Sequence, residues 1–118
     1  MSDMRIYHNP ACSQSRGALE IVEQRDPDVE VVLYLETPPS KEELERFIEL
    51  LEDPAADLVR KDKRFEELGL VESDYQTPQQ VVAVLLAHPE LMQRPIIVKN
   101  EKAVLARPSE KVLALFED

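Results

Sequence analysis

The order of short elements in the first third of the chain limits the fold most strongly. Two strands are predicted, one over residues 5–8 and one over residues 29–34. The second of these segments is rich in β-branched side chains. Asn9-Pro10-Ala11 ends the first strand, and apolar residues along one stripe predict a helix over residues 12–24. A strand, a helix and a strand within about 35 residues form a βαβ unit, so the chain begins as an α/β protein.

The middle of the chain is predicted to be helical. Two capping boxes begin helices, one formed by Ser40 with Glu43 and the other by Thr77 with Gln80. The second helix also has Pro78 at its first position, where proline is favoured, and an apolar stretch follows that predicts a buried helix.

The last part of the chain returns to strands. Residues 96–98 and 103–105 predict a hairpin whose turn has no glycine, so we expect Asn100 to take the left-handed conformation. A last helix begins at Pro108, and we expect three of its residues to be buried: Val112, Leu113 and Phe116. A βαβ half and a ββα half predict an α/β protein with a thioredoxin-like fold. We expect a single domain over residues 1–118, with a helical insertion at about 40–92.

Charge and composition exclude several classes of protein. The chain has 118 residues and a formal net charge of −10, from 14 Lys+Arg and 24 Asp+Glu. It lacks the basic character that phosphate contacts need, so we expect no binding to nucleic acid or to anionic membranes. The longest apolar run, residues 81–87, is too short to span a bilayer, and the polar first residues leave no room for a signal peptide. We therefore expect a cytoplasmic protein.

Scarce residue types exclude further sites. The chain has two glycines, too few for the Gly-rich turn of a Rossmann fold or a P-loop. Its one cysteine, Cys12, allows no internal disulfide and no Cys-rich zinc site. The two histidines, His8 and His88, are far apart in sequence and give little support to a catalytic zinc site, so we expect no bound metal.

Cys12 stands where the first predicted strand gives way to the first predicted helix. The free amides of a first helical turn point toward such a side chain, and the partial positive charge there stabilises anions. The pKa of a thiol in this position can fall from about 8.5 to about 3.5–7.5. The hydroxyl of Ser15 and the charge of Arg16 would favour the thiolate further. The alternative is a buried cysteine that acts as a small hydrophobic side chain.

His8 lies at the end of the first predicted strand, close to Cys12 in sequence. Its charge could favour the thiolate. It could equally be a partly buried strand histidine with no catalytic duty, and the residues alone leave both interpretations open.

The residues around Cys12 resemble the His-x3-Cys-x3-Arg motif of the glutaredoxin-linked arsenate reductases, the ArsC family. In this chain the motif runs from His8 through Cys12 to Arg16. The resemblance continues in order along the chain, in the segments Tyr34-Leu35-Glu36-Thr37-Pro38-Pro39, Val59-Arg60-Lys61, Glu66-Glu67-Leu68-Gly69-Leu70, His88-Pro89, Arg94-Pro95-Ile96-Ile97-Val98 and Arg107-Pro108-Ser109-Glu110.

The resemblance implies a thioredoxin-like fold with a helical insertion, and a nucleophilic role for Cys12. It implies that three arginines bind the oxyanion substrate: Arg60, Arg94 and Arg107. Three further residues of the family pattern support the cysteine: His8, Ser15 and Arg16. The peptide bond between Arg94 and Pro95 matches the cis-proline position of thioredoxin-like folds, so we expect a cis bond there.

The activity that the resemblance implies is reduction of arsenate to arsenite. Glutathione would be the co-substrate, glutaredoxin the protein that restores Cys12, and no cofactor would stay bound. A single cysteine agrees with this. Cys12 can form a covalent adduct with arsenic, but the two-electron reduction needs a second sulfur, which must come from an external thiol. Guanidinium groups suit such an oxyanion better than lysine does. We expect a monomer.

Two other functions are compatible with the same family. A thioredoxin-like monothiol oxidoreductase acting on glutathione mixed disulfides needs Cys12 but not the three arginines. A non-enzymatic transcription adaptor that binds RNA polymerase needs a protein-binding face and tolerates their absence. The joint presence of Arg60, Arg94 and Arg107 favours the arsenate reductase.

Two departures from the family pattern lie beside Cys12. Ser13-Gln14 stand where an arsenate reductase is expected to have Gly-Thr. Gly17 lies early in a predicted helix, where glycine costs about 0.5–1 kcal/mol relative to alanine.

Overall fold

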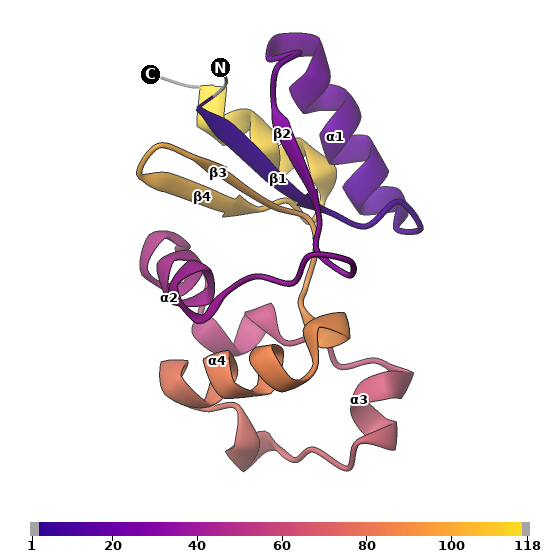
Figure 1. Ribbon diagram of the computed structural model, residues 1–118, viewed down its shortest axis with the longest axis vertical. Helices are drawn as coiled ribbons and strands as arrows, with labels where there is room; N and C mark the ends of the chain where they lie inside the picture. The colour runs from indigo at the N-terminus through magenta and orange to yellow at the C-terminus, as the bar shows by residue number, and fades with distance from the viewer. Residues whose placement is uncertain (1–2, 117–118) are drawn as a thin grey trace.

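The computed structural model describes residues 3–116, whose strands form one mixed sheet (Figure 1). The strand order is β2-β1-β3-β4, with β1 parallel to β2 and antiparallel to β3, and with β3 antiparallel to β4. The bounds are Met4–His8 for β1, Glu30–Leu33 for β2, Ile96–Lys99 for β3 and Lys102–Leu105 for β4. The four predicted strands are therefore confirmed. In the β3–β4 turn Asn100 has a φ of 55°, the left-handed conformation predicted for it.

One face of the sheet is covered by α1 (Ser13–Arg25) and by the C-terminal helix η4 (Ser109–Phe116). Met4, Ile6 and Ile97 contribute side chains from the sheet, and Ala18 and Val22 contribute the apolar stripe of α1. This small core fixes α1 against the sheet, and with it the position of the helix N-terminus.

The C-terminal helix differs from its prediction. It is a 3₁₀-helix, in which residues three apart lie on the same side because a turn takes three residues. Ser109, Val112 and Leu115 are therefore the buried residues. The expectation for Val112 is confirmed, whereas Leu113 and Phe116 are only partly buried, because that expectation assumed α-helical spacing.

The other face of the sheet packs on the helices between β2 and β3, which form the lower half of Figure 1. Tyr7, Phe47, Leu85 and Ile96 belong to the core that joins the two parts. The helices are α2 (Lys41–Leu50), η1 (Ala55–Leu58), α3 (Lys63–Glu67), η2 (Glu72–Asp74), α4 (Pro78–Ala87) and η3 (Pro89–Leu91).

Both predicted capping boxes are confirmed. The Ser40 side chain accepts from the backbone of Glu43, and the Glu43 side chain accepts from the backbone of Ser40, at the start of α2. Thr77 and Gln80 do the same at the start of α4. In α4 the apolar stretch is not buried throughout, since Leu86 is 44% exposed while Val81 is fully buried.

Two peptide bonds before proline are cis. The bond between Arg94 and Pro95 is cis, as predicted from the family resemblance. The bond between Arg107 and Pro108 is cis as well, which the sequence did not predict.

The structure gives a reason for Gly17 in α1. A Cβ atom added there would lie 2.7 Å from the hydroxyl oxygen of Ser109. That hydroxyl is held in place, because it donates to the backbone oxygen of Gln14 at 2.7 Å. The Ser109 backbone N–H also donates to the side-chain oxygen of Gln14 at 3.0 Å. Glycine therefore allows η4 to pack directly on the first turn of α1.

Gly17→Ala should therefore lower the free energy of unfolding by about 1–2 kcal/mol, although alanine is the better helix former by about 1 kcal/mol. Urea denaturation measures this change. In a Ser109→Ala background the same substitution should lower the free energy of unfolding by less, because the hydroxyl that would contact the new Cβ atom is absent. Equal costs in the two backgrounds would contradict the contact.

Candidate active site

Four strand ends converge at the N-terminus of α1. β1 ends at His8, and the C-terminal end of β2 lies beside it, where His8 pairs with Leu33. β3 runs the other way, so its first residue, Ile96, pairs with Tyr7 and with the last residue of β4, Leu105. The residues that follow β1, β2 and β4, and those that precede β3, therefore share one end of the sheet.

A tight turn places Cys12 at this end. The N–H of Cys12 donates to the backbone oxygen of Asn9 at 3.0 Å, and the Asn9 side-chain oxygen accepts from the N–H of Ala11 at 2.9 Å. Asparagine side chains commonly close such turns. Cys12 itself is the N-cap of α1, with extended backbone (φ −99°, ψ 124°) and a partly exposed side chain. The prediction of a thiol at the start of the first helix is confirmed.

The surroundings of Cys12 favour the thiolate. Partial burial of the sulfur disfavours its charge, but the backbone N–H of Ser15, the guanidinium groups of Arg94 and Arg107 and the backbone N–H of Gln14 outweigh that effect. Together they lower the pKa of the Cys12 thiol to about 7. Much of the thiol is therefore ionised at neutral pH, and it is also accessible. These two properties characterise a reactive cysteine and not an inert buried one.

Arg94 and Arg107 meet because they flank the β3–β4 hairpin. Arg94 precedes β3, Arg107 follows β4, and the N–H of Ala106 donates to the backbone oxygen of Pro95 at 3.0 Å. One terminal nitrogen of Arg107 lies 3.8 Å from the Cys12 sulfur and 2.9 Å from the backbone oxygen of Arg94. The positive charge of Arg107 thus lies beside the Cys12 sulfur.

Arg60 reaches the same region from the helical insertion. The backbone N–H of Arg60 donates to the backbone oxygen of Leu91 at 2.6 Å, beside an isolated β-bridge between Val59 and Met92. This pairing places Arg60 next to the segment that leads to Arg94. The side chain forms an ion pair through Nε with Asp62 at 3.0 Å.

Arg60 and Arg107 line one cleft of about 520 Å³, which we call the arginine cleft. Lys61 and Gln93 also line it, together with the carboxylates of Asp53, Asp57 and Asp62. The three predicted arginines are thus brought to one region of the molecule, although they lie far apart in sequence. Arg94 and Arg107 act on the sulfur, and Arg107 and Arg60 face the adjoining cleft.

His8 and Ser15 form a buried pair behind the cysteine. Nδ1 of His8 lies 2.6 Å from the hydroxyl oxygen of Ser15, which also accepts from the N–H of Asn9 at 3.0 Å. Burial lowers the pKa of His8, Glu23 opposes that effect and Arg16 adds to it. The imidazole is therefore mostly neutral, and we assign its Nδ1 as the acceptor of the Ser15 hydroxyl proton.

These contacts correct the expectation for the hydroxyl of Ser15 and show what the side chain of Arg16 binds. The hydroxyl of Ser15 serves His8 and not the sulfur, because its side chain is fully buried beneath the turn. Its backbone N–H favours the thiolate instead. Arg16 is exposed and donates to the backbone oxygen of Pro10 at 2.8 Å, so its side chain closes the turn before Cys12. His8 does not supply a cation to the site, which favours the structural interpretation of this residue.

Sequence reasoning missed three residues of this region. Asn9 closes the turn, Gln14 binds Ser109, and Tyr34 lies fully buried just after β2. Asn9 could have been found, since an asparagine before a proline is a turn signal. Ser109, which binds Gln14, is far away in sequence, and the burial of Tyr34 depends on distant segments, so no local pattern indicates either residue.

A model of the ArsC family matches residues 7–115. The chain belongs to the ArsC family. It is 41% identical over 119 residues to an arsenate reductase from Escherichia coli, in an alignment that covers 100% of this chain and 84% of that protein. It is 39% identical over 114 residues to the uncharacterized protein YfgD of Escherichia coli (strain K12), with 95% of each chain covered.

Solved structures of this family share the fold. An arsenate reductase from Vibrio cholerae matches with a TM-score of 0.84 and 38% identity, over 94% of this chain and 95% of that one. The predicted thioredoxin-like α/β fold is thereby confirmed. Within residues 3–116 no helix is long and apolar enough to cross a membrane. The same residues contain no group of three or more His, Cys, Asp or Glu side chains that could hold a metal ion.

The electrostatics of Cys12 can be tested by its reaction with iodoacetamide, which reports only this residue because the chain has one cysteine. The rate should rise with pH with a midpoint near 7, because only the thiolate reacts. Arg107→Ala should move the midpoint up by about one unit, since it removes the cation at the sulfur.

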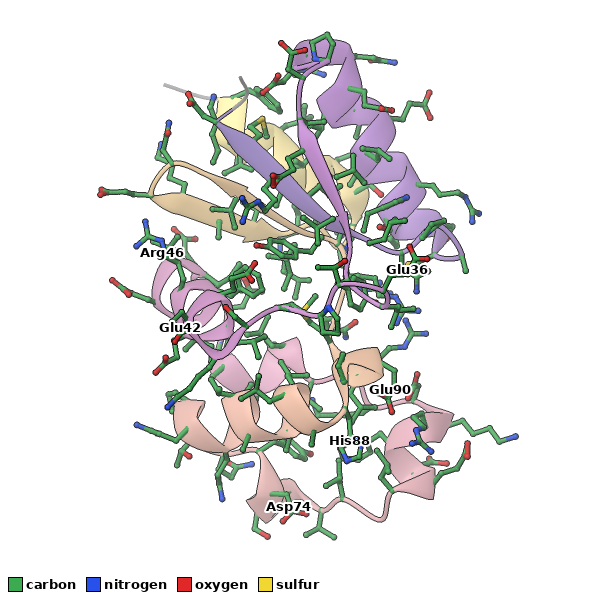
Figure 2. The ribbon with its side chains drawn as sticks, viewed as in Figure 1. Glu36, Glu42, Arg46, Asp74, His88 and Glu90 are labelled. Atoms are coloured by element: carbon green, nitrogen blue, oxygen red, sulfur yellow. The ribbon has the colours of Figure 1, made fainter. Side chains whose placement is uncertain are left out.

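Arg46→Ala is the matched control, because Arg46 lies on α2, away from α1 (Figure 2). It removes the same charge and should leave the midpoint unchanged. A midpoint above 8 in the unmodified protein, or equal shifts in the two variants, would contradict the role of Arg107.

Proposed function

We propose that this protein is an arsenate reductase that converts arsenate to arsenite with Cys12 as nucleophile. The observation that carries the proposal is the combination of an ionised, accessible thiol with arginines from three segments of the chain. A thiol alone would suit many reactions. Guanidinium groups around it select a tetrahedral oxyanion, because their planar donors match its paired oxygens.

The local charge of the site supports an anionic substrate despite the acidic chain. Three cations of the arginine cleft match its three carboxylates, and Asp53 also lies 4.0 Å from Lys111. Arg94 adds a positive charge at the sulfur. The ion pair of Arg60 uses Nε, which leaves its terminal nitrogens for a ligand. Distant surface charge is screened over about 10 Å at 0.1 M salt.

The first chemical step forms a bond between Cys12 and arsenic. The thiolate attacks arsenate, a sulfur–arsenic bond forms, and one arsenate oxygen leaves as water after taking up protons. No electrons are exchanged in this condensation. The backbone amides of Gln14 and Ser15 keep the thiolate available, and Arg94 and Arg107 offset the charge of the incoming anion.

The second step reduces arsenic. A thiolate of glutathione attacks the Cys12 sulfur, a sulfur–sulfur bond forms, and the sulfur–arsenic bond breaks with its electron pair left on arsenic. The products are arsenite and a Cys12–glutathione disulfide. The chain cannot supply the second sulfur, because Cys12 is its only cysteine. A glutaredoxin thiol then removes the glutathione and restores the Cys12 thiol.

Cys12→Ser should abolish arsenate turnover in an assay with glutathione and glutaredoxin, with a loss of at least about a thousand-fold. The serine hydroxyl is not ionised at neutral pH and cannot form a disulfide with glutathione. Arsenite release is the measurement. Turnover retained by this variant would overturn the proposed role of Cys12.

Arg60→Ala separates arsenate reduction from the alternative activity on glutathione mixed disulfides. The KM for arsenate should rise about ten-fold or more, because an oxyanion loses one charged hydrogen-bond donor. Reduction of a glutathione mixed disulfide of a small thiol should change little. Arg64→Ala, which removes an exposed arginine paired with Glu90, serves as the control. Equal losses in the two reactions would argue against an oxyanion site and for the monothiol oxidoreductase.

A further inference from the structure

The hydroxyl of Tyr34 is a buried donor without a partner. Tyr34 is fully buried directly after β2, and its oxygen has no hydrogen-bond partner among the described residues. Buried tyrosine hydroxyls usually have a partner, so an unused one calls for an explanation.

Tyr34 belongs to the Cys12 site. The side chains of Asn9 and Arg94 lie close enough to the phenol to lower its pKa, although neither forms a hydrogen bond with its oxygen, and the Cys12 sulfur also acts on it. Burial raises the pKa of Tyr34, although Arg94 and Asn9 oppose that effect. The phenol is therefore protonated at neutral pH and can donate a hydrogen bond.

The other buried polar atoms without a partner lie in the same region. Within residues 3–116 they are Nε of Arg94, a second donor, and Oε1 of Gln93, an acceptor in the lining of the arginine cleft. The nearby Asn9 oxygen already accepts from the N–H of Ala11. Two donors thus remain unused beside Cys12, and an oxygen of a bound ligand would satisfy both.

We propose that the Tyr34 hydroxyl donates a hydrogen bond to an oxygen of the oxyanion held at Cys12, next to Arg94. This inference rests on the proposed function, which supplies the oxyanion. Tyr34 would act on the bound anion and not on the resting thiolate, because the structure gives no hydrogen bond between its hydroxyl and the sulfur. Gln93 would accept from a protonated oxygen of the same ligand.

This role predicts an unusual combination of effects for Tyr34→Phe. A buried hydroxyl that makes no hydrogen bond in the free protein contributes little to folding, so its removal should leave the urea midpoint unchanged or higher. Removal of a donor to the anion should weaken arsenate binding about ten-fold or more, the loss expected for a hydrogen bond to a charged group. A merely structural tyrosine would show the opposite pattern.

The experiment measures how arsenate protects Cys12 from iodoacetamide. The concentration that halves the alkylation rate should be about ten-fold higher in Tyr34→Phe than in the unmodified protein, at an unchanged pH midpoint of alkylation. Tyr7→Phe is the control, since the Tyr7 hydroxyl donates to Glu43 on α2. That variant should lose stability and keep its protection by arsenate.

The outcomes separate the two hypotheses. If arsenate fails to protect the unmodified protein, the proposed function fails, and the inference falls with it. If the unmodified protein and Tyr34→Phe are protected equally, the inference alone is overturned. A lower urea midpoint in Tyr34→Phe would also overturn it, because the hydroxyl would then have a partner in the free protein.

Discussion

The N-terminus of α1 governs this site, because its amides and its orientation decide whether Cys12 is a thiolate. The backbone N–H groups of Gln14 and Ser15 reach the sulfur only while the first turn of α1 stays in place. Two sets of contacts hold that turn. The Ser15 hydroxyl binds His8 and Asn9 at the end of β1, and Gln14 binds Ser109 at the start of η4. Several residues of the family motif thus position the thiolate without touching it.

The arginines depend on a second constraint, which is the convergence of strand ends. The β3–β4 hairpin brings Arg94 and Arg107 together, and the bridge between Val59 and Met92 attaches the segment that carries Arg60. The helical insertion therefore does more than cover the sheet, since it supplies one wall of the arginine cleft. The result is a concentration of arginines within a chain whose net charge is −10, although three carboxylates also line the arginine cleft.

Local sequence patterns predicted most of the elements. The capping boxes at Ser40 and Thr77, the left-handed Asn100 and the position of Cys12 all follow from chemistry within a few residues. The 3₁₀ geometry of η4 does not follow from such local chemistry, because the spacing of its apolar residues is compatible with an α-helix as well. Gly17 looked like a local cost and is explained by a tertiary contact with Ser109.

The site was predictable in composition but not in contacts. The family resemblance named the residues, whereas the direction of the Ser15 hydroxyl and the unused hydroxyl of Tyr34 depend on how distant segments pack. No spacing rule reports whether a buried donor has an acceptor. Such features become visible only when the hydrogen bonds of each buried polar group are counted.

The nature of the contact between Cys12 and the oxyanion can be observed directly by X-ray absorption at the arsenic edge. With arsenate bound and no glutathione present, the unmodified protein should show a sulfur neighbour of arsenic in addition to oxygen, and Cys12→Ser should show oxygen alone. A spectrum with only oxygen neighbours in both proteins would contradict nucleophilic attack by Cys12 and would indicate a site that binds the anion without reacting with it.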